Sequence, residues 1–271
     1  MRLLDSYIYK LAQKPIFHKE FFAKLKSFKD LEDVDVEDIE NLRFLGLPII
    51  KNNNYTFTLD TLEKSIDSQK FCIVDIEANG SKASVDQIIE IGAVMLENGQ
   101  EIGKFNSLIK TDILPDSIEH LTGITLEELQ YAPSLKSVLE AFRLFLKDAV
   151  FVAHNVNFDY YFISTSMEKA GFGPLLNRRL CTIDLAKKTI VAPKYGLGAL
   201  TEYLGIGFEN HHRALCDAQA TALVFLKSLE NLPKEITTVE ELIAFAKPQQ
   251  KRKREKKQPR QLLSPSTSTL T

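Results

Sequence analysis

The sequence predicts an α/β domain built on a mixed β-sheet, with a small helical unit before it and a basic tail behind it. From residue 71 onward, three strand-like segments precede an alternation of helix-like and strand-like segments, an order typical of a mixed sheet covered by helices. Before residue 65, apolar residues recur mostly at helical spacing. A chain of 271 residues has room for one domain of about 150 to 200 residues and a smaller one.

Residues 1–64 are predicted to form the smaller domain. Their apolar spacing indicates three helices, and LPIIKNNNYTFTL indicates a hairpin, because two apolar runs flank three asparagines. Three helices and a hairpin favour a winged helix. A small helical cap or partner-docking domain is the alternative, because the third helix begins with the acidic run DVDVEDIE, which is a poor match for phosphate.

Residues 65–235 are predicted to form the main domain. FCIVDIEAN, IIEIGAVMLE and KFNSLIK predict three strands, and Asn98-Gly99 is the pair that favours a type I′ turn between the last two. Residues 115–130 are expected to be a polar connection. The elements expected after it are a helix over 135–146, the strand FVAHN, the helix FDYYFISTSMEKAG, further elements in CTIDLAKKTI and GALTEYLGI, and a helix over 214–229. After this domain, residues 236–247 are predicted to form a C-terminal helix.

Residues 248–271 are predicted to form a disordered tail. They contain seven basic residues against one acidic residue and few apolar ones, so they cannot bury enough surface to fold alone. Because the whole chain has a formal charge of -2, any attraction to a polyanion must be local. The tail is expected to hold nucleic acid loosely, to act as a docking arm, or simply to be solvated.

The composition also indicates where the protein works. No apolar run approaches the roughly 18 residues of a membrane span, and the first residues, MRLLDSYIYK, lack the apolar stretch of a signal peptide. The cysteines Cys72, Cys181 and Cys216 are odd in number and form no CxxC pair, so neither a disulfide framework nor a structural zinc site is expected. We therefore expect a cytoplasmic protein without a membrane partner.

Two acidic residues, Asp75 and Glu77, lie in the first strand of the main domain. Because they are two residues apart, their side chains emerge on the same face of the strand. A strand with one wet face also alternates acid with apolar residues, so this pair alone is weak support for a site.

A second cluster lies in HNVNFD, where a strand passes into a helix. Asn155 and Asp159 are four residues apart and therefore share one face of that helix. Such junctions are where α/β proteins place functional groups. The alternative is that Asp159 only complements the helix dipole from the first turn.

A third cluster, HRALCDA, contains His212 and Asp217. Five residues apart, they would lie about 140 degrees apart on one helix, so they can share a site only if His212 lies in the loop before it. Gly205, Gly207 and Asn210 support a loop there, and the neighbouring His211 is the alternative histidine. Four carboxylates converging on one pocket would repel one another unless divalent cations lay between them. The pattern therefore predicts a metal site.

The three clusters together resemble a known family. DIEANG, HNVNFD and HRALCDA are similar to the three exonuclease motifs of the DEDD superfamily, in the histidine-bearing DnaQ-like branch typified by the epsilon subunit of bacterial DNA polymerase III. IIEIGAV, LTGIT and LCTIDLAKK also resemble that family, so the likeness covers about residues 70–230. It does not account for residues 1–64.

The resemblance implies an RNase H-like exonuclease fold with a mixed five-stranded sheet. It also implies that two Mg²⁺ or Mn²⁺ ions are held by four catalytic acids, with His212 as the general base, because imidazole can accept a proton near neutral pH. The implied metal ligands are Asp75, Glu77, Asp159 and Asp217.

The resemblance implies that Ala78 and Asn79 help to hold the terminal nucleotide, and Asn155 and Phe158 are further candidates for substrate binding. Ala78 departs from the family pattern, which usually has Thr there, followed by another small polar residue. Phe158 borders Asp159 and is the best candidate for stacking on a base.

The expected function is a metal-dependent 3′–5′ exonuclease that removes nucleoside 5′-monophosphates from single-stranded or frayed DNA ends. Proofreading in DNA replication or repair is the expected setting, with a DNA polymerase subunit as a candidate partner. One alternative is an exoribonuclease that trims RNA. The other is a non-catalytic nucleic-acid-binding or scaffold protein of the same fold, against which the complete set of acids argues.

Overall fold

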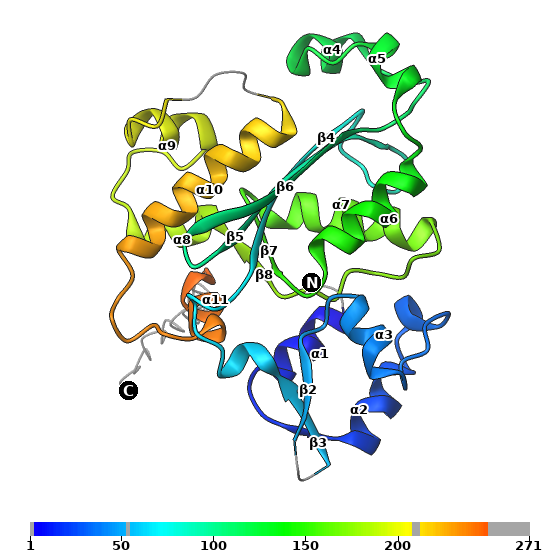
Figure 1. The fold of residues 1–271 in the computed structure, drawn as a ribbon, viewed down its shortest axis with the longest axis vertical. Coiled ribbons are helices and arrows are strands. Elements are labelled where there is room, and N and C mark those ends of the chain that lie inside the picture. The colour runs from blue at the N-terminus through cyan, green and yellow to red at the C-terminus, as the bar shows by residue number, and fades with distance from the viewer. Residues whose placement is uncertain (1–2, 53–54, 208–211, 249–271) are drawn as a thin grey trace, which may run out of the picture.

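A computed structural model describes residues 3–52, 55–207 and 212–248 of the chain (Figure 1). A five-stranded sheet runs through the centre of this part, in the order β6-β5-β4-β7-β8. Its strands are β4 (Phe71–Ala78), β5 (Ile88–Glu97), β6 (Gln100–Leu108), β7 (Val150–Ala153) and β8 (Arg179–Cys181). β5 runs antiparallel to both of its neighbours, whereas β4, β7 and β8 are parallel. The predicted mixed five-stranded sheet is therefore confirmed.

The predicted tight turn between β5 and β6 is also present. Asn98 and Gly99 both have positive φ, at 51° and 68°, as a type I′ turn requires. Asparagine and glycine adopt this conformation more readily than other residues, which explains why this pair closes the hairpin.

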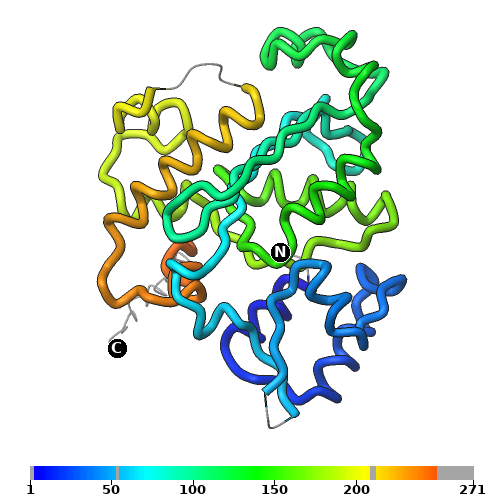
Figure 2. The backbone as a smooth tube through the Cα atoms, in the orientation of Figure 1, coloured from blue at the N-terminus to red at the C-terminus, as the bar shows by residue number. Residues whose placement is uncertain are grey.

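Helices cover both faces of the sheet (Figures 1 and 2). On one face, alternate β4 residues such as Val74 pack in a core with α6 (Leu135–Leu146) and α7 (Val156–Lys169). On the other face, Phe71 and Ile73 pack in a second core with the remaining helices. These are α8 (Thr182–Thr189), α10 (Ala214–Glu230) and α11 (Val239–Ala246). A smaller cluster joins α9 (Leu197–Tyr203) to α10.

The expectation of a polar connection over residues 115–130 is wrong. The segment forms two short helices, α4 (Asp116–Thr122) and α5 (Leu126–Tyr131). Gly123 ends α4 with a positive φ, and Thr125 with Glu128 forms a capping box that starts α5. Leu129 of α5 packs against the sheet residue Ile89, which anchors the pair of helices.

Residues 3–62 pack around a hydrophobic core of their own. A three-stranded antiparallel sheet has the order β1-β3-β2. The elements, in sequence order, are α1 (Leu3–Leu11), β1 (Ile16–Phe17), α2 (His18–Leu25), a 3-10 turn (Lys29–Leu31), α3 (Ile39–Phe44), β2 (Ile49–Asn52), β3 (Thr56–Leu59) and a 3-10 turn (Asp60–Leu62). The predicted hairpin is β2–β3, although Asn53 and Asn54 lie outside the described residues. The winged-helix assignment and the domain boundary at 64 remain predictions.

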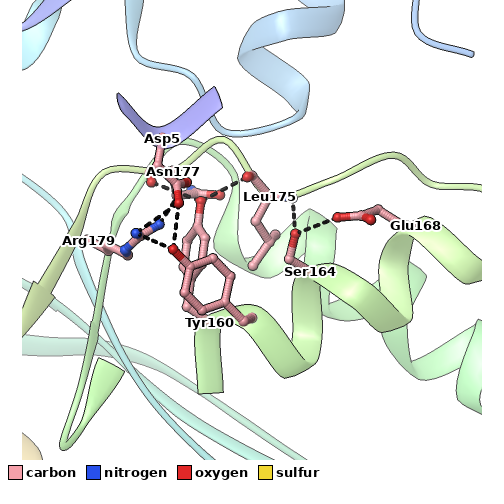
Figure 3. A network of polar contacts seen from close by, with 8 residues as sticks. Asp5, Tyr160, Ser164, Glu168, Leu175, Asn177 and Arg179 are labelled. Carbon is pink, nitrogen blue, oxygen red and sulfur yellow. Dashed lines mark hydrogen bonds and ion pairs between the residues drawn. The ribbon is translucent and has the colours of Figure 1, made fainter. Parts of the chain in front are cut away.

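An ion pair joins α1 to the edge of the five-stranded sheet (Figure 3). The Asp5 carboxylate accepts hydrogen bonds of 3.0 and 3.2 Å from the Arg179 guanidinium. The same guanidinium lies 4.6 and 4.8 Å from the ring centroids of Tyr160 and Tyr161. Both tyrosines directly follow Asp159 in α7. The N-terminal elements therefore contact the helix that carries one of the predicted metal ligands.

A buried arginine forms a second joint. Arg143 of α6 donates hydrogen bonds to the carbonyl oxygens of Leu45 at 3.1 Å, Gly173 at 3.0 Å and Pro174 at 3.3 Å. These oxygens solvate a cation that is otherwise removed from water, and burial lowers the pKa of Arg143 to about 10. The side chain of Leu176 also belongs to the N-terminal core.

The C-terminal helix α11 lies within the predicted range. Its Glu240 accepts two hydrogen bonds of 2.6 Å from Arg178 and one of 2.7 Å from Thr61. The Arg178 and Glu240 side chains are each 8% exposed. No helix within the described ranges has both the length and the apolar character needed to cross a membrane.

Candidate active site

The carboxyl ends of β4 and β7 form one side of the site. β7 pairs with the first three residues of β4, Phe71 to Ile73, and then ends at Ala153. Asp75 and Glu77 lie beyond this paired stretch. They continue the alternation of Phe71 and Ile73 and therefore face α10.

Asp159 reaches the same place from the first turn of α7. The helix begins immediately after β7, with Asn155 at the N-cap in a left-handed conformation, φ 80°. Asp159 is only 3% exposed and accepts a hydrogen bond of 3.2 Å from the Ile76 backbone N–H. The end of β7 therefore leaves space beside β4, and Asp159 occupies it.

The first turn of α10 packs directly on β5, which brings Asp217 to the site. Gly92 of β5 is the register partner of Asp75. A Cβ atom at Gly92 would lie 2.1 Å from the Leu215 nitrogen and 2.2 Å from the Ala214 carbonyl carbon. A side chain here would push the helix away, so glycine is required for this approach. Asp217 lies in that first turn.

His212 lies in the loop before α10, as the spacing to Asp217 predicts. Its φ is 66°, and it precedes the N-cap residue Arg213. Ligand atoms of Glu77, His212 and Asp217 all lie within 4.8 Å of one another. Asn210 and the alternative histidine, His211, fall outside the described residues. Asp75 lies close enough to Asp159 and Asp217 for their charges to raise its pKa. The catalytic roles of the five residues remain predictions.

Burial and mutual repulsion raise the pKa values of the acids. The pKa of Asp75 rises well above its usual range, first through burial and then through the carboxylates of Asp159 and Asp217. The pKa of Glu77 rises to about 7 through burial and its acidic neighbours, with Arg213 acting in the opposite direction. Burial raises the pKa of Asp159 to about 8, although backbone N–H groups partly offset it. A cation among these groups would favour their charged forms.

The donor set fits a divalent cation. Carboxylate oxygens predominate, and the imidazole of His212 is the nitrogen donor within reach of Glu77 and Asp217. Such oxygen-rich sets suit Mg²⁺ and Mn²⁺ better than thiophilic metals. The site can therefore hold a divalent metal.

The predicted substrate-binding residues divide into two pairs. Asn155 and Phe158 are exposed on the first turn of α7, with the Phe158 ring 37% exposed and set edge-on against Phe162. The Ala78 methyl group instead packs in the core on the opposite face of β4. Asn79 uses its amide internally, donating to the Ile113 carbonyl at 3.0 Å and accepting from the Gln87 N–H at 2.8 Å. Contacts of these four residues with substrate remain predictions.

Sequence reasoning missed two residues that organise the site. His154 donates through Nε2 to the Tyr195 carbonyl at 2.9 Å, and its Nδ1 lies 2.9 Å from the Thr182 hydroxyl. Burial lowers the pKa of His154, so the neutral ring holds the start of α7 against α8. The second residue is Glu90, which is 1% exposed. Its sequence signal is an acid inside the apolar strand IIEIGAV, since a buried acid needs a partner.

The fold and the acid cluster together define an α/β domain of the nuclease class, with a donor set that can hold a divalent metal. The exonuclease family model, RNase_T, matches residues 72–225, which is more than half of the chain. The chain therefore belongs to the exonuclease family, and the predicted membership of the DEDD superfamily of 3′–5′ exonucleases is confirmed.

The relatives of this chain are much longer than the chain itself. The DNA polymerase III PolC-type proteins of Thermotoga petrophila and Thermotoga maritima are each 36% identical over 214 residues, covering 78% of this chain and 15% of the relative. The PolC-type protein of Staphylococcus epidermidis is 36% identical over 173 residues, covering 63% of this chain and 12% of the relative. The chain thus spans about 15% of these proteins or less.

Solved structures of E. coli exonuclease I share the fold. The complex with a dT13 oligonucleotide is 20% identical with a TM-score of 0.53, covering 59% of this chain and 40% of that chain. The zinc-bound complex with single-stranded DNA is 21% identical with a TM-score of 0.57, covering 62% and 42%. The predicted exonuclease fold is therefore confirmed.

Proposed function

We propose that this protein removes nucleoside 5′-monophosphates from the 3′ end of single-stranded or frayed DNA, in proofreading during replication or repair. The observation that carries the proposal is the convergence of three motifs, distant in sequence, at the open end of β4. The similarity to PolC-type DNA polymerase III supports DNA as the substrate and a DNA polymerase subunit as a partner. The free cysteines fit a reducing cytoplasm as the place of action.

Each residue of the site has a proposed role. Asp75, Glu77, Asp159 and Asp217 would hold two Mg²⁺ or Mn²⁺ ions. When bound, the ions supply positive charge to the scissile phosphate and to the leaving oxygen. The Ile76 N–H keeps the Asp159 carboxylate aimed into the site. His212, exposed at the mouth of the site, accepts the proton of the water that attacks phosphorus.

The substrate enters from the exposed first turn of α7 in this proposal. Phe158 would stack on the terminal base, because an exposed aromatic ring beside the acids offers a sequence-tolerant surface to single strands. Asn155, exposed at the N-cap of the same helix, would contact the backbone of the strand.

The test is degradation of a 5′-labelled single-stranded DNA with Mg²⁺ or Mn²⁺, and with EDTA as the metal-free control. The wild type should produce a ladder that shortens from the 3′ end. His212→Ala should lower the rate by roughly 10²- to 10⁴-fold through loss of the general base, and Asp217→Asn should remove most turnover. The matched control is Glu230→Gln, an exposed acid at the far end of α10, which should keep full activity.

The outcomes separate the alternatives. Full activity of His212→Ala or Asp217→Asn would overturn the site assignment, and undiminished activity in EDTA would overturn the metal requirement. Comparing the cleavage rates of DNA and RNA oligonucleotides of the same sequence gives the sugar preference. Faster cleavage of RNA would favour the exoribonuclease alternative over DNA as the substrate. A wild type without activity on either would favour the scaffold alternative.

A further inference from the structure

A fifth carboxylate lies next to the four acids of the site. Glu90 of β5 is the register partner of Glu77 and is 1% exposed. Its charge contributes to the raised pKa values of Asp75 and Glu77. An acid in this position makes the site more negative, so its own charge must be neutralised by partners outside the four acids.

The contacts of Glu90 lead to the start of α10. Its carboxylate accepts hydrogen bonds from Arg213 Nε at 3.2 and 3.3 Å and from Arg213 Nη2 at 3.0 Å. It also accepts the Ala214 backbone N–H at 3.0 Å. Arg213 is the N-cap residue and Ala214 the first residue of the helix. One carboxylate therefore neutralises an arginine and satisfies an N–H that has no partner within the helix.

These contacts fix the segment that carries two predicted catalytic residues. His212 immediately precedes Arg213, in a left-handed conformation that is uncommon for residues other than glycine. Asp217 lies one helical turn after Arg213, whose carbonyl accepts the Asp217 N–H at 3.0 Å. Glu90 itself lies on β5, which is paired along its length with β4, the strand that holds Asp75 and Glu77.

We propose that Glu90 is a positioning residue, which through Arg213 and the Ala214 N–H sets the distance between the β4 acids and the His212–Asp217 pair. It does not hold a metal, because its oxygens are already used by Arg213 and Ala214. Gly92, two residues along β5, completes the same contact by allowing the helix to touch the strand. The inference rests on the exonuclease function proposed above.

The experiment compares single-turnover cleavage of a labelled single-stranded DNA by the full chain and its variants. With enzyme in saturating excess the rate constant reports the geometry of the folded site, and circular dichroism of each variant reports its folded fraction. Glu90→Gln should keep the wild-type folded fraction and lower the rate constant about 10- to 100-fold, as expected when reacting groups shift by about 1 Å. Because Asp217 moves with Arg213, Mn²⁺ titration by electron paramagnetic resonance should show several-fold weaker binding.

Further variants make the test specific. Arg213→Lys keeps the charge but loses the two-pronged guanidinium, so it should lower the rate constant and the Mn²⁺ affinity as Glu90→Gln does. It replaces Glu90→Gln in the test if that variant fails to fold. The double variant should be no slower than the slower single variant, because both changes break one contact. Glu101→Gln, an exposed acid on the β5–β6 hairpin that pairs with Lys104, should match the wild type.

The outcomes are distinct. An unchanged rate constant with a reduced folded fraction would make the contact of Glu90 with Arg213 and Ala214 merely structural and would overturn the inference. A wild-type rate constant and Mn²⁺ affinity in both single variants would also overturn it. If Asp217→Asn keeps full activity, the proposed function fails. If Asp217→Asn is inactive while Glu90→Gln is fully active, only the inference fails.

Discussion

In the absence of divalent cations, the free energy of unfolding should fall as the pH rises from about 5 to 8. Burial and the nearby carboxylates raise the pKa of Glu77 from 4.5 to about 7 and that of Asp159 from 3.8 to about 8. Between these values the folded state keeps protons that the unfolded chain has released. These bound protons stabilise the native state fully below pH 3.8 to 4.5. The stabilisation is lost as the pH rises through about 7 to 8.

The magnitude follows from Glu77 alone. A rise from 4.5 to about 7, at roughly 1.36 kcal/mol for each pKa unit, corresponds to about 3 kcal/mol. For a chain of this size, that loss lowers the melting temperature by roughly 6 to 12 °C. Glu128 and Glu241 have lowered pKa values, and their stabilising effect is already present above about pH 5. They therefore do not mask the trend. The lowered pKa of His154 opposes the trend as the pH rises to 6.5, so the loss of stability is read above that pH.

The assay is urea unfolding in EDTA, followed by circular dichroism at several pH values between 5 and 8.5. Added Mg²⁺ or Mn²⁺ should restore stability at pH 8, because a ligand of the native state stabilises it by mass action. Glu77→Gln should flatten the pH dependence in EDTA and be more stable than the wild type at pH 8. A metal-free stability that stays constant or rises between pH 6.5 and 8 would refute the reasoning.

Two further predictions concern stability and substrate affinity. Glu240→Ala should lower the unfolding free energy by about 3 to 5 kcal/mol, because it leaves Arg178 buried without its carboxylate. Urea unfolding measures this change against the exposed control Glu235→Ala, and equal stability of the two variants would contradict the prediction. Phe158→Ala should raise the KM for single-stranded DNA roughly 5- to 150-fold, through loss of about 1 to 3 kcal/mol of stacking. Steady-state kinetics test this against Phe44→Ala, an exposed ring in α3, and an unchanged KM would assign Phe158 to packing alone.

Much of the sheet domain could be predicted because its signals are local. The alternation along residues 71–78 identified β4 and placed Asp75 and Glu77 on one face. The Asn98-Gly99 pair predicted the turn that the structure contains. α4 and α5 were missed because their apolar residues are few. The capping box of Thr125 and Glu128 was their readable signal, since T-x-x-E marks a helix start.

The partners of buried charges could not be predicted in this way. Glu90 meets Arg213 across 123 positions, and Arg178 meets Glu240 across 62. Nothing local in the sequence selects one arginine over another, because the choice depends on how β5 and α10 cross. The two-residue strand β1 was missed for a similar reason, since its pairing with Phe57 and Thr56 depends on the later hairpin.

The joint made by Arg143 and Leu176 affects how the chain can be dissected. A fragment starting at residue 65 would deprive the Arg143 guanidinium of the Leu45 carbonyl and would expose Leu176 to solvent. Such a truncation leaves a desolvated cation and a new apolar patch, both of which promote aggregation. The residues before the sheet domain therefore cover Leu176 and supply a carbonyl to Arg143, and shorter fragments would need a polar replacement at Leu176.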